Sequence, residues 1–202
     1  MRNFWWGHHD KKQKIHWLSW ERLCKSKSEE GLGFRDSQKF NDALLAKQVW
    51  SLIHNKNSQF YAVFSAKFFP CGNVLDTKDS IRGSYAWTSI RRAAHVIKKG
   101  MVWRIGDGNA TCIWQDNWLP DQGHRKIISP CSSLPPDSKV SQLINSQNRT
   151  WNTPLLEQLF FLYDAEAIQS IPLSHNPGPD VIIWPHTRDG VYSVRSAYHL
   201  LR

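Results

Sequence analysis

The sequence predicts a mainly α-helical α+β chain with two short β-hairpins, forming a fragment of a larger multidomain protein. Three observations lead to this fold class. Apolar residues recur at three- and four-residue spacing through most of residues 36–99, which is the period of an amphipathic helix. Short β-prone runs flank turn-forming residues near 101–114 and again near 181–194. The final residues begin an amphipathic helix that stops at Arg202 with its apolar stripe only started.

The first helices follow a mixed aromatic and basic segment. A short helix that includes Ile15, Leu18 and Leu23 is expected to end before Gly31, where the glycines of Gly31–Phe34 should interrupt it. The next helix is expected from about residue 36 to residue 53, where six large apolar residues recur at helical spacing. Asp36 or Ser37 can accept hydrogen bonds from the first free backbone amides, which makes either a suitable N-cap.

Two further helices complete the first half. One is expected over 58–69, with phenylalanines on one stripe and Pro70 ending it. The other is expected over 84–99 and places its apolar residues inward. Gly100 stands where a helix-terminating glycine is common.

The glycine-rich stretch after this helix predicts a hairpin near 101–114. Met101–Ile105 and Ala110–Trp114 are β-prone, and Gly106–Asn109 between them has the composition of a tight turn. A phosphate-binding loop would continue into a helix with a Lys and a Ser or Thr, and this loop continues into a strand-like run. A calcium loop would require glycine at the sixth position, where Cys112 stands. Asp107 is therefore interpreted as a turn former.

The second half reads as short elements joined by loops. Residues 120–138 are rich in Pro, Ser and Asp and predict a long exposed loop. Short helices are then expected, with Asp164 as the N-cap of the last: Val140–Asn145, Pro154–Leu162 and Ala165–Ile171.

A second hairpin and a final helix close the chain. Val181–Trp184 and Val191–Val194 are expected to pair across a turn that contains Asp189 and Gly190. Ser193 or Ser196 is expected to start the last helix.

The positive charge is concentrated in the N-terminal half. Residues 1–100 contain 18 Lys and Arg against 8 Asp and Glu, whereas residues 101–202 contain 8 against 9. The first half therefore carries +10 and the second half −1, so the whole excess of +9 belongs to the N-terminal half. A one-sided basic surface is typical of a protein that binds a polyanion. A solvated basic surface without a partner explains the same numbers.

The sequence gives no indication of a metal, a cofactor, a disulfide framework or a membrane span. The four cysteines are widely spaced, no C-x-x-C occurs, and no window approaches 18 consecutive apolar residues. Lysines follow the N-terminal aromatics at once, which does not fit a signal peptide. We therefore expect an intracellular chain that is not secreted, with reduced thiols.

Residues for catalysis are equally hard to find. Neither G-x-S-x-G nor H-E-x-x-H occurs, and no two aspartates are adjacent as a two-metal polymerase site would favour. Asp107 and Asp116 are the only carboxylates in their neighbourhood, and a nuclease needs several in one site. The chain is therefore not expected to be an enzyme by itself.

Several strings in a fixed order resemble plant LINE-type, non-LTR retrotransposon reverse transcriptases, in the segment that follows the polymerase core. The strings span nearly the whole chain, and many contain tryptophan: Phe4–Gly7, Ile15–Cys24, Gly31–Asp36, Phe40–Trp50, Ala66–Pro70, Ser84–Ile90, Gly100–Gly108, Ile113–Pro120 and Gly190–Leu201.

The resemblance implies a division of the chain into four parts. Residues 1–119 would be a basic, thumb-like or connector region, 120–138 a loop, 139–189 short helices with a strand, and 190–202 the start of a zinc-binding domain. The catalytic aspartates and zinc ligands of that family would lie outside this sequence. The remaining domains of a reverse transcriptase polyprotein would then be partners of this segment.

The resulting hypothesis is a non-catalytic fragment that contacts RNA or DNA through phosphate contacts. The candidate residues are Lys11, Lys12, Lys14, Arg91, Arg92, Lys98 and Lys99. Exposed aromatics such as Trp5 and Trp6 could stack on bases. A solvated helix face explains the same basic residues, and a self-sufficient nucleic-acid-binding or adaptor module is the alternative function.

Overall fold

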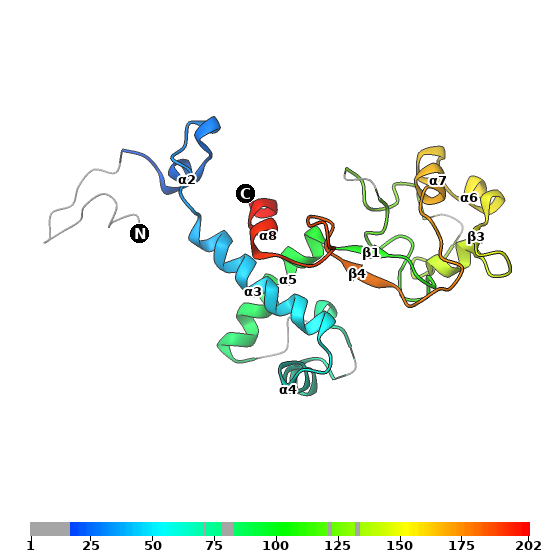
Figure 1. Ribbon diagram of the computed structural model, residues 1–202, viewed down its shortest axis with the longest axis horizontal. Coiled ribbons are helices and arrows are strands. Elements are labelled where there is room, and N and C mark those ends of the chain that lie inside the picture. Colours follow the sequence, from blue (N-terminus) through cyan, green and yellow to red (C-terminus); the bar gives the residue numbers. More distant parts are fainter. Residues whose placement is uncertain (1–16, 71, 78–82, 121–122, 132–133) are drawn as a thin grey trace, which may run out of the picture.

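The computed structural model describes residues 17–70, 72–77, 83–120, 123–131 and 134–202. Within these residues it confirms the predicted fold class: helices α2 to α8 are accompanied by two small, two-stranded antiparallel sheets. Figure 1 shows an elongated molecule in which α3, α4, α5 and α8 lie together, while α6, α7 and β3 form a separate group. The strands β1 and β4 run between these two groups (Figure 1).

The N-terminal helices begin where their capping residues predict. The short α2 (Trp20–Cys24) is capped by Ser19, and α3 (Ser37–His54) is capped by Asp36, whose Oδ1 accepts from the amides of Gln38 and Lys39. The caps of α4 (Gln59–Phe68) and α5 (Tyr85–Gly100) are serine hydroxyls, at Ser58 and Ser84. The prediction of Asp36 as a cap is thus confirmed.

A first hydrophobic core joins the N-terminal half of the chain to its C-terminal segment. It contains apolar side chains from α3, from the end of α4, from residues 74–75 and from α5, together with the segment from β4 (Val181–Ile183) to α8 (Val194–Leu201). Trp87 and Trp184 are both fully buried in it. Trp87 stacks on Phe68, with ring centroids 4.4 Å apart and an interplanar angle of 3°. The large indole surfaces thus serve mainly to fill this core.

Gly100 is needed for close packing and does not end the helix as predicted. It is the last residue of α5, and Met101 is the C-cap in an extended conformation. A Cβ at Gly100 would lie 2.3 Å from the Trp184 ring and 2.7 Å from the Leu200 side chain. Glycine is therefore required here because α8 and the Trp184 ring approach the α5 backbone closely.

The predicted hairpin near 101–114 is wrong in its pairing. The strand β1 (Val102–Arg104) pairs antiparallel with β4, with Trp103 opposite Ile182. Residues 110–114 form a single bridge from Cys112 to Lys139 and a turn. β1 pairs with a strand some 80 residues away because this pairing covers β1 and also joins the two cores. Trp103 of β1 contacts both cores.

Asp180 fills the concave side of the glycine-rich loop. Its Oδ1 accepts from the amides of Gly106 and Gly108, and its Oδ2 accepts from the amides of Ala110 and Thr111 and from the Thr111 hydroxyl. Successive inward-facing amides of this kind can bind phosphate in other proteins. Here the Asp180 carboxylate of the same chain accepts the hydrogen bonds of these amides. Asp107 forms the predicted turn, since its carboxylate accepts from the Asn109 amide at 3.0 Å.

A second core lies around the short elements of the second half. It contains the 3₁₀ helix η3 (Val140–Leu143), β2 (Ile144–Asn145), β3 (Thr150–Trp151), α6 (Thr153–Leu159) and α7 (Leu162–Gln169). The predicted helix over Val140–Asn145 is therefore a 3₁₀ turn running into a strand. Its last residues pair with Thr150–Trp151, which extended backbone allows and a helix does not.

Two further expectations in this half are corrected. Asp164 lies inside α7 and is not its N-cap; Phe161 holds that position. The buried Asp164 carboxylate accepts instead from the amide and the hydroxyl of Ser129. These hydrogen bonds attach the loop that contains Ser129 to α7. Residues 191–193 form no strand: β4 pairs with β1, and Ser193 caps α8.

The helices of the described residues include none with the length and apolar character needed to cross a bilayer.

Candidate nucleic-acid interface

The predicted basic residues of α5 lie on two different flanks of that helix. Arg91, Arg92 and Lys98 line a hollow of about 420 Å³ beside the 3₁₀ helix η2 (Val74–Asp76). Lys99 lines a different hollow, and its ammonium group donates to the Leu200 carbonyl at 3.4 Å. The helical period separates adjacent residues by about 100°. The four predicted contacts therefore do not form one patch.

The other predicted contacts lie outside the described residues. These are the three N-terminal lysines Lys11, Lys12 and Lys14, together with the possible base-stacking residues Trp5 and Trp6.

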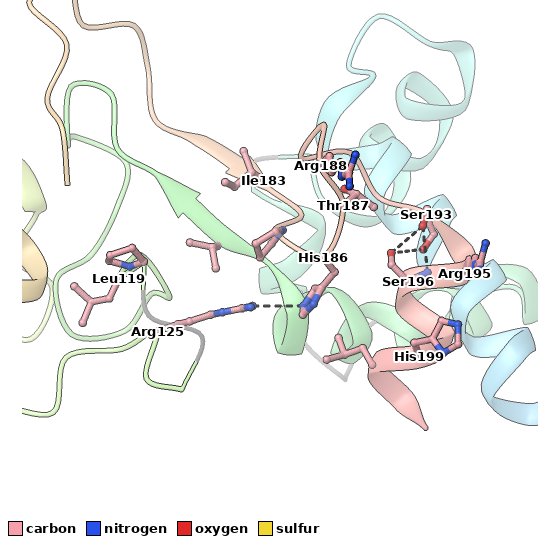
Figure 2. Close-up of a pocket in the computed structure, with 14 residues that line it drawn as sticks. Leu119, Arg125, Ile183, His186, Thr187, Arg188, Ser193, Arg195, Ser196 and His199 are labelled. Atoms are coloured by element: carbon pink, nitrogen blue, oxygen red, sulfur yellow. Dashed lines mark hydrogen bonds between the residues drawn. The ribbon is translucent and has the colours of Figure 1, made fainter. Parts of the chain in front are cut away.

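A larger open groove lies between the β1–β4 ladder and α8. It measures about 1200 Å³, and three arginines and two histidines are among its lining residues. Figure 2 shows these side chains coming from three places: the loop after Leu119, the turn after Ile183, and α8. The cationic and imidazole groups are Arg125, His186, Arg188, Arg195 and His199.

The local structure explains how these side chains reach the groove. The turn after β4 closes with a hydrogen bond from the Trp184 amide to the Gly190 carbonyl, which places His186 and Arg188 at its tip. Arg195 and His199 are four residues apart on α8 and thus on neighbouring turns of one face. Arg125 is held by the Gly100 carbonyl, to which its Nη1 donates at 3.1 Å.

A smaller hollow of about 450 Å³ continues the groove. The two share Arg125, His186 and Leu200, and the smaller one adds Lys99, His124 and Lys126. None of the described residues that line either hollow carries a carboxylate. We call this combined surface the basic groove. Its concave form focuses positive potential, because low-dielectric walls surround the charges.

Burial changes the pKa of two groups in the basic groove. Burial and the neighbouring Arg125 charge both lower the pKa of His186, while a hydrogen bond with the Gly100 carbonyl partly opposes them. Burial also lowers the pKa of Arg125, which nevertheless stays protonated because guanidinium is such a strong base. At neutral pH the groove therefore presents a fixed guanidinium beside an uncharged imidazole.

Sequence reasoning missed this groove. Arg125, Lys126, Arg188 and Arg195 all belong to the half whose net charge is slightly negative. Summing charges along the chain averaged these cations with Asp and Glu residues that fold elsewhere. The adjacent cations Arg125 and Lys126 were the one local sequence signal of a basic surface in this half.

The described residues contain no group of three or more His, Cys, Asp or Glu side chains that could hold a metal ion. Asp107 and Asp116 also have structural partners nearby, the Asn109 amide and the Cys112 amide. The chemistry that the described site supports is the binding of an anion by arginine and lysine.

Comparison with known proteins relates the chain to plant proteins. It is 40% identical over 123 residues to the "Uncharacterized mitochondrial protein AtMg00310" of Arabidopsis thaliana, covering 60% of this chain and 80% of that protein. The chain therefore belongs to the same family as AtMg00310. No protein-family model matches it, and no solved structure matches it significantly.

A second relative is much longer. The chain is 29% identical over 205 aligned residues to the "Putative ribonuclease H protein At1g65750" of Arabidopsis thaliana. The match covers 99% of this chain and 33% of that protein. The chain thus corresponds along its whole length to about a third of this relative.

Proposed function

We propose that the chain is a non-catalytic segment of a plant retrotransposon reverse transcriptase polyprotein, and that it binds the phosphate backbone of RNA or DNA. The ordered strings that resemble LINE-type enzymes support the first part. A match along the whole chain to one third of a longer protein also fits a segment of a polyprotein. In this proposal residues 190–202 begin the zinc-binding domain, and the other domains are partners.

The basic groove is the observation that carries the nucleic-acid part. Its cations come from segments far apart in sequence, and its described lining residues include no carboxylate. Nucleic acid offers a row of phosphates, each of which an arginine can contact with two hydrogen bonds. Phosphate contacts position a nucleic acid without reading its bases, so we expect weak sequence selectivity. The α5 flank with Arg91, Arg92 and Lys98 would be a second, smaller contact surface.

The test is the salt dependence of binding to a fluorescent single-stranded oligonucleotide of about 20 nucleotides. Each phosphate contact to a single strand contributes roughly −0.7 to the slope of log K against log salt concentration. A variant with Arg125, Arg188 and Arg195 replaced by Ala should bind more weakly and reduce the slope by about 2. The matched control replaces the exposed Lys27, Lys47 and Lys56, which lie outside the groove.

The control keeps the same net charge change, so it separates local contact from overall charge. Equal losses in both variants would contradict a role for the basic groove. Absence of binding by the unaltered chain at low salt would contradict nucleic-acid binding altogether. RNA and duplex DNA of the same length should be compared in parallel, because contacts to phosphate alone do not distinguish them.

The alternative is a self-sufficient nucleic-acid-binding or adaptor module. The two hydrophobic cores favour it, since each is formed by described residues and Trp103 links them. A single cooperative thermal transition of the isolated chain would support this reading. A broad transition that oligonucleotide does not change would indicate that the fold needs the other domains of a polyprotein.

A further inference from the structure

The side chains of Arg125 and His186 meet in the wall of the basic groove. Arg125 Nη1 lies 3.5 Å from His186 Nε2, a contact that Figure 2 shows as a dashed line. A guanidinium group can only donate hydrogen bonds, so Nε2 can accept from Arg125 only when it carries no proton. In that state His186 is a neutral imidazole with its proton on Nδ1.

Both side chains are fixed by further contacts. The His186 ring packs on Trp184, with centroids 5.0 Å apart, and the Trp184 indole donates to the Ser196 hydroxyl at 2.7 Å. Arg125 donates to the Gly100 carbonyl from the same Nη1 that faces His186. Little side-chain freedom is left to lose when a ligand binds, which favours affinity.

Every charged or titratable group around His186 in the two hollows is basic. Lys99 comes from α5, and Arg188 comes from the same turn as His186. The preceding loop contributes His124, Arg125 and Lys126, and α8 contributes Arg195 and His199. Since no described lining residue is acidic, a proton on His186 gains no compensating charge from the described residues that line the two hollows. An anion in the groove would supply it.

We infer that Arg125 and His186 together form a seat for one phosphodiester group of a nucleic acid, and that the seat takes up a proton when it is filled. Once His186 Nε2 is protonated, two donors stand 3.5 Å apart and can each contact an oxygen of the same phosphate. The single negative charge of the phosphodiester offsets the repulsion between the two neighbouring positive charges. This inference rests on the proposed function and names the residues and the protonation state at its centre.

The sign of the pH dependence follows from this linkage. Without ligand, the pKa of His186 is below its ordinary value. A bound phosphodiester favours the protonated imidazole and raises the pKa again. Binding should therefore tighten as pH falls from about 7.5 to about 5.5, because the unperturbed pKa of histidine is near 6.5. One linked proton limits the change to about tenfold in affinity per pH unit.

The experiment measures the dissociation constant of a uridine oligonucleotide of about 12 nucleotides between pH 5.5 and pH 8, at constant ionic strength. A phosphodiester probe is preferable to inorganic phosphate, whose own second pKa near 6 would mask the effect. The unaltered chain should bind up to about tenfold more tightly per unit fall in pH. His186→Gln should bind more weakly than the unaltered chain at pH 5.5 and lose most of that dependence.

The matched controls are His124→Gln and His199→Gln, which remove the other imidazoles of the basic groove. Both should retain the pH dependence. If His186→Gln keeps it, or if one of the controls loses it instead, the inference is wrong. A flat pH profile of the unaltered chain with clear binding overturns the inference but leaves the proposed function standing. No binding at any pH overturns both.

A measurement on the unaltered chain avoids reliance on folding of the variants. Calorimetric titrations in two buffers with different ionisation enthalpies give the number of protons taken up per bound oligonucleotide. We expect a value between zero and one that is largest near pH 6.5. Zero uptake throughout the range, with binding present, contradicts a protonated seat.

Discussion

Asp180 and Thr111, 69 residues apart, are joined by two hydrogen bonds to a single carboxylate oxygen. Asp180 Oδ2 accepts from the Thr111 amide at 3.0 Å and from its hydroxyl at 2.9 Å. Asp180 directly precedes β4, and the glycine-rich loop directly follows β1. The carboxylate thus closes the end of the β1–β4 ladder where the second core begins. Charge-assisted hydrogen bonds of this kind are stronger than neutral ones.

Replacing this carboxylate should destabilise the fold. Asp180→Asn introduces an amide whose NH2 group faces backbone donors, so several loop amides lose their acceptor. We expect a loss of roughly 2–3 kcal/mol in the free energy of unfolding, measured by urea titration. Asp137→Asn is the control, since Asp137 is exposed, and should change stability by less than about 0.5 kcal/mol. Equal effects would show that the loop tolerates the change.

The same carboxylate should make stability sensitive to acid. Burial opposes its ionisation, but hydrogen bonds from Gly106, Gly108 and Thr111 outweigh this and lower the pKa of Asp180. A lowered folded-state pKa gives stability that is present above the unfolded value of about 3.9 and is lost as pH falls through the folded value. The difference in stability between the unaltered chain and Asp180→Asn should therefore shrink below about pH 4.

Urea titrations at pH 7, 4 and 3 test this expectation. Two exposed carboxylates with lowered pKa, Glu29 and Asp189, are present in both proteins, so their effects largely cancel in the comparison. A difference that stays constant down to pH 3 would mean that the carboxylate's charge contributes nothing to stability.

Adding a methyl group at Gly100 should disturb the first core. The new Cβ would overlap the Trp184 ring and crowd the Leu200 side chain. We expect Gly100→Ala to cost about 1–3 kcal/mol and to lower the midpoint of thermal unfolding. Gly72→Ala is the control because a Cβ there meets no atom within 4 Å. Its effect should stay within about 1 kcal/mol, in either direction.

Removing the hydroxyl of Tyr192 should weaken the contact between the C-terminal segment and α3. That hydroxyl donates to the Ala43 carbonyl at 2.8 Å in the buried core, and burial raises its pKa strongly. Tyr192→Phe leaves the carbonyl without this partner and should cost about 1–2 kcal/mol. Tyr85→Phe, at a side chain that is 90% exposed, should have almost no effect on urea unfolding.

The two basic surfaces should contribute differently to the proposed binding. Replacing Arg92 and Lys98 by Ala removes the exposed cations of the α5 flank, which lie in an open hollow of about 420 Å³. We expect a smaller loss of affinity than for a double replacement of Arg125 and Arg188, because the basic groove is larger and gathers more cations. A larger loss at α5 would place the main contact there.

Residues near one another in sequence were predicted well because their structure depends on local physics. Asp36 caps α3, Pro70 follows α4, and Asp107 forms its turn, as the sequence indicated. Helical period and capping act over a few residues, so they can be recognised without knowing the rest of the fold. The strand partners could not be predicted in the same way. Two adjacent β-prone runs predict a hairpin, yet β1 pairs with distant β4.

The sequence by itself determined the fold class, the main helices, the turn at the glycine-rich loop and the net positive charge. Only the tertiary structure decided that β1 pairs with β4, that Asp180 accepts hydrogen bonds from the loop amides, and that Arg125 contacts His186. The β1–β4 pairing, the Asp180 hydrogen bonds and the Arg125–His186 contact join residues 61 to 81 positions apart. Their energies come from burial and from hydrogen bonds that exist only after the chain has folded. Local propensity and charge summed along the sequence contain no term for such contacts.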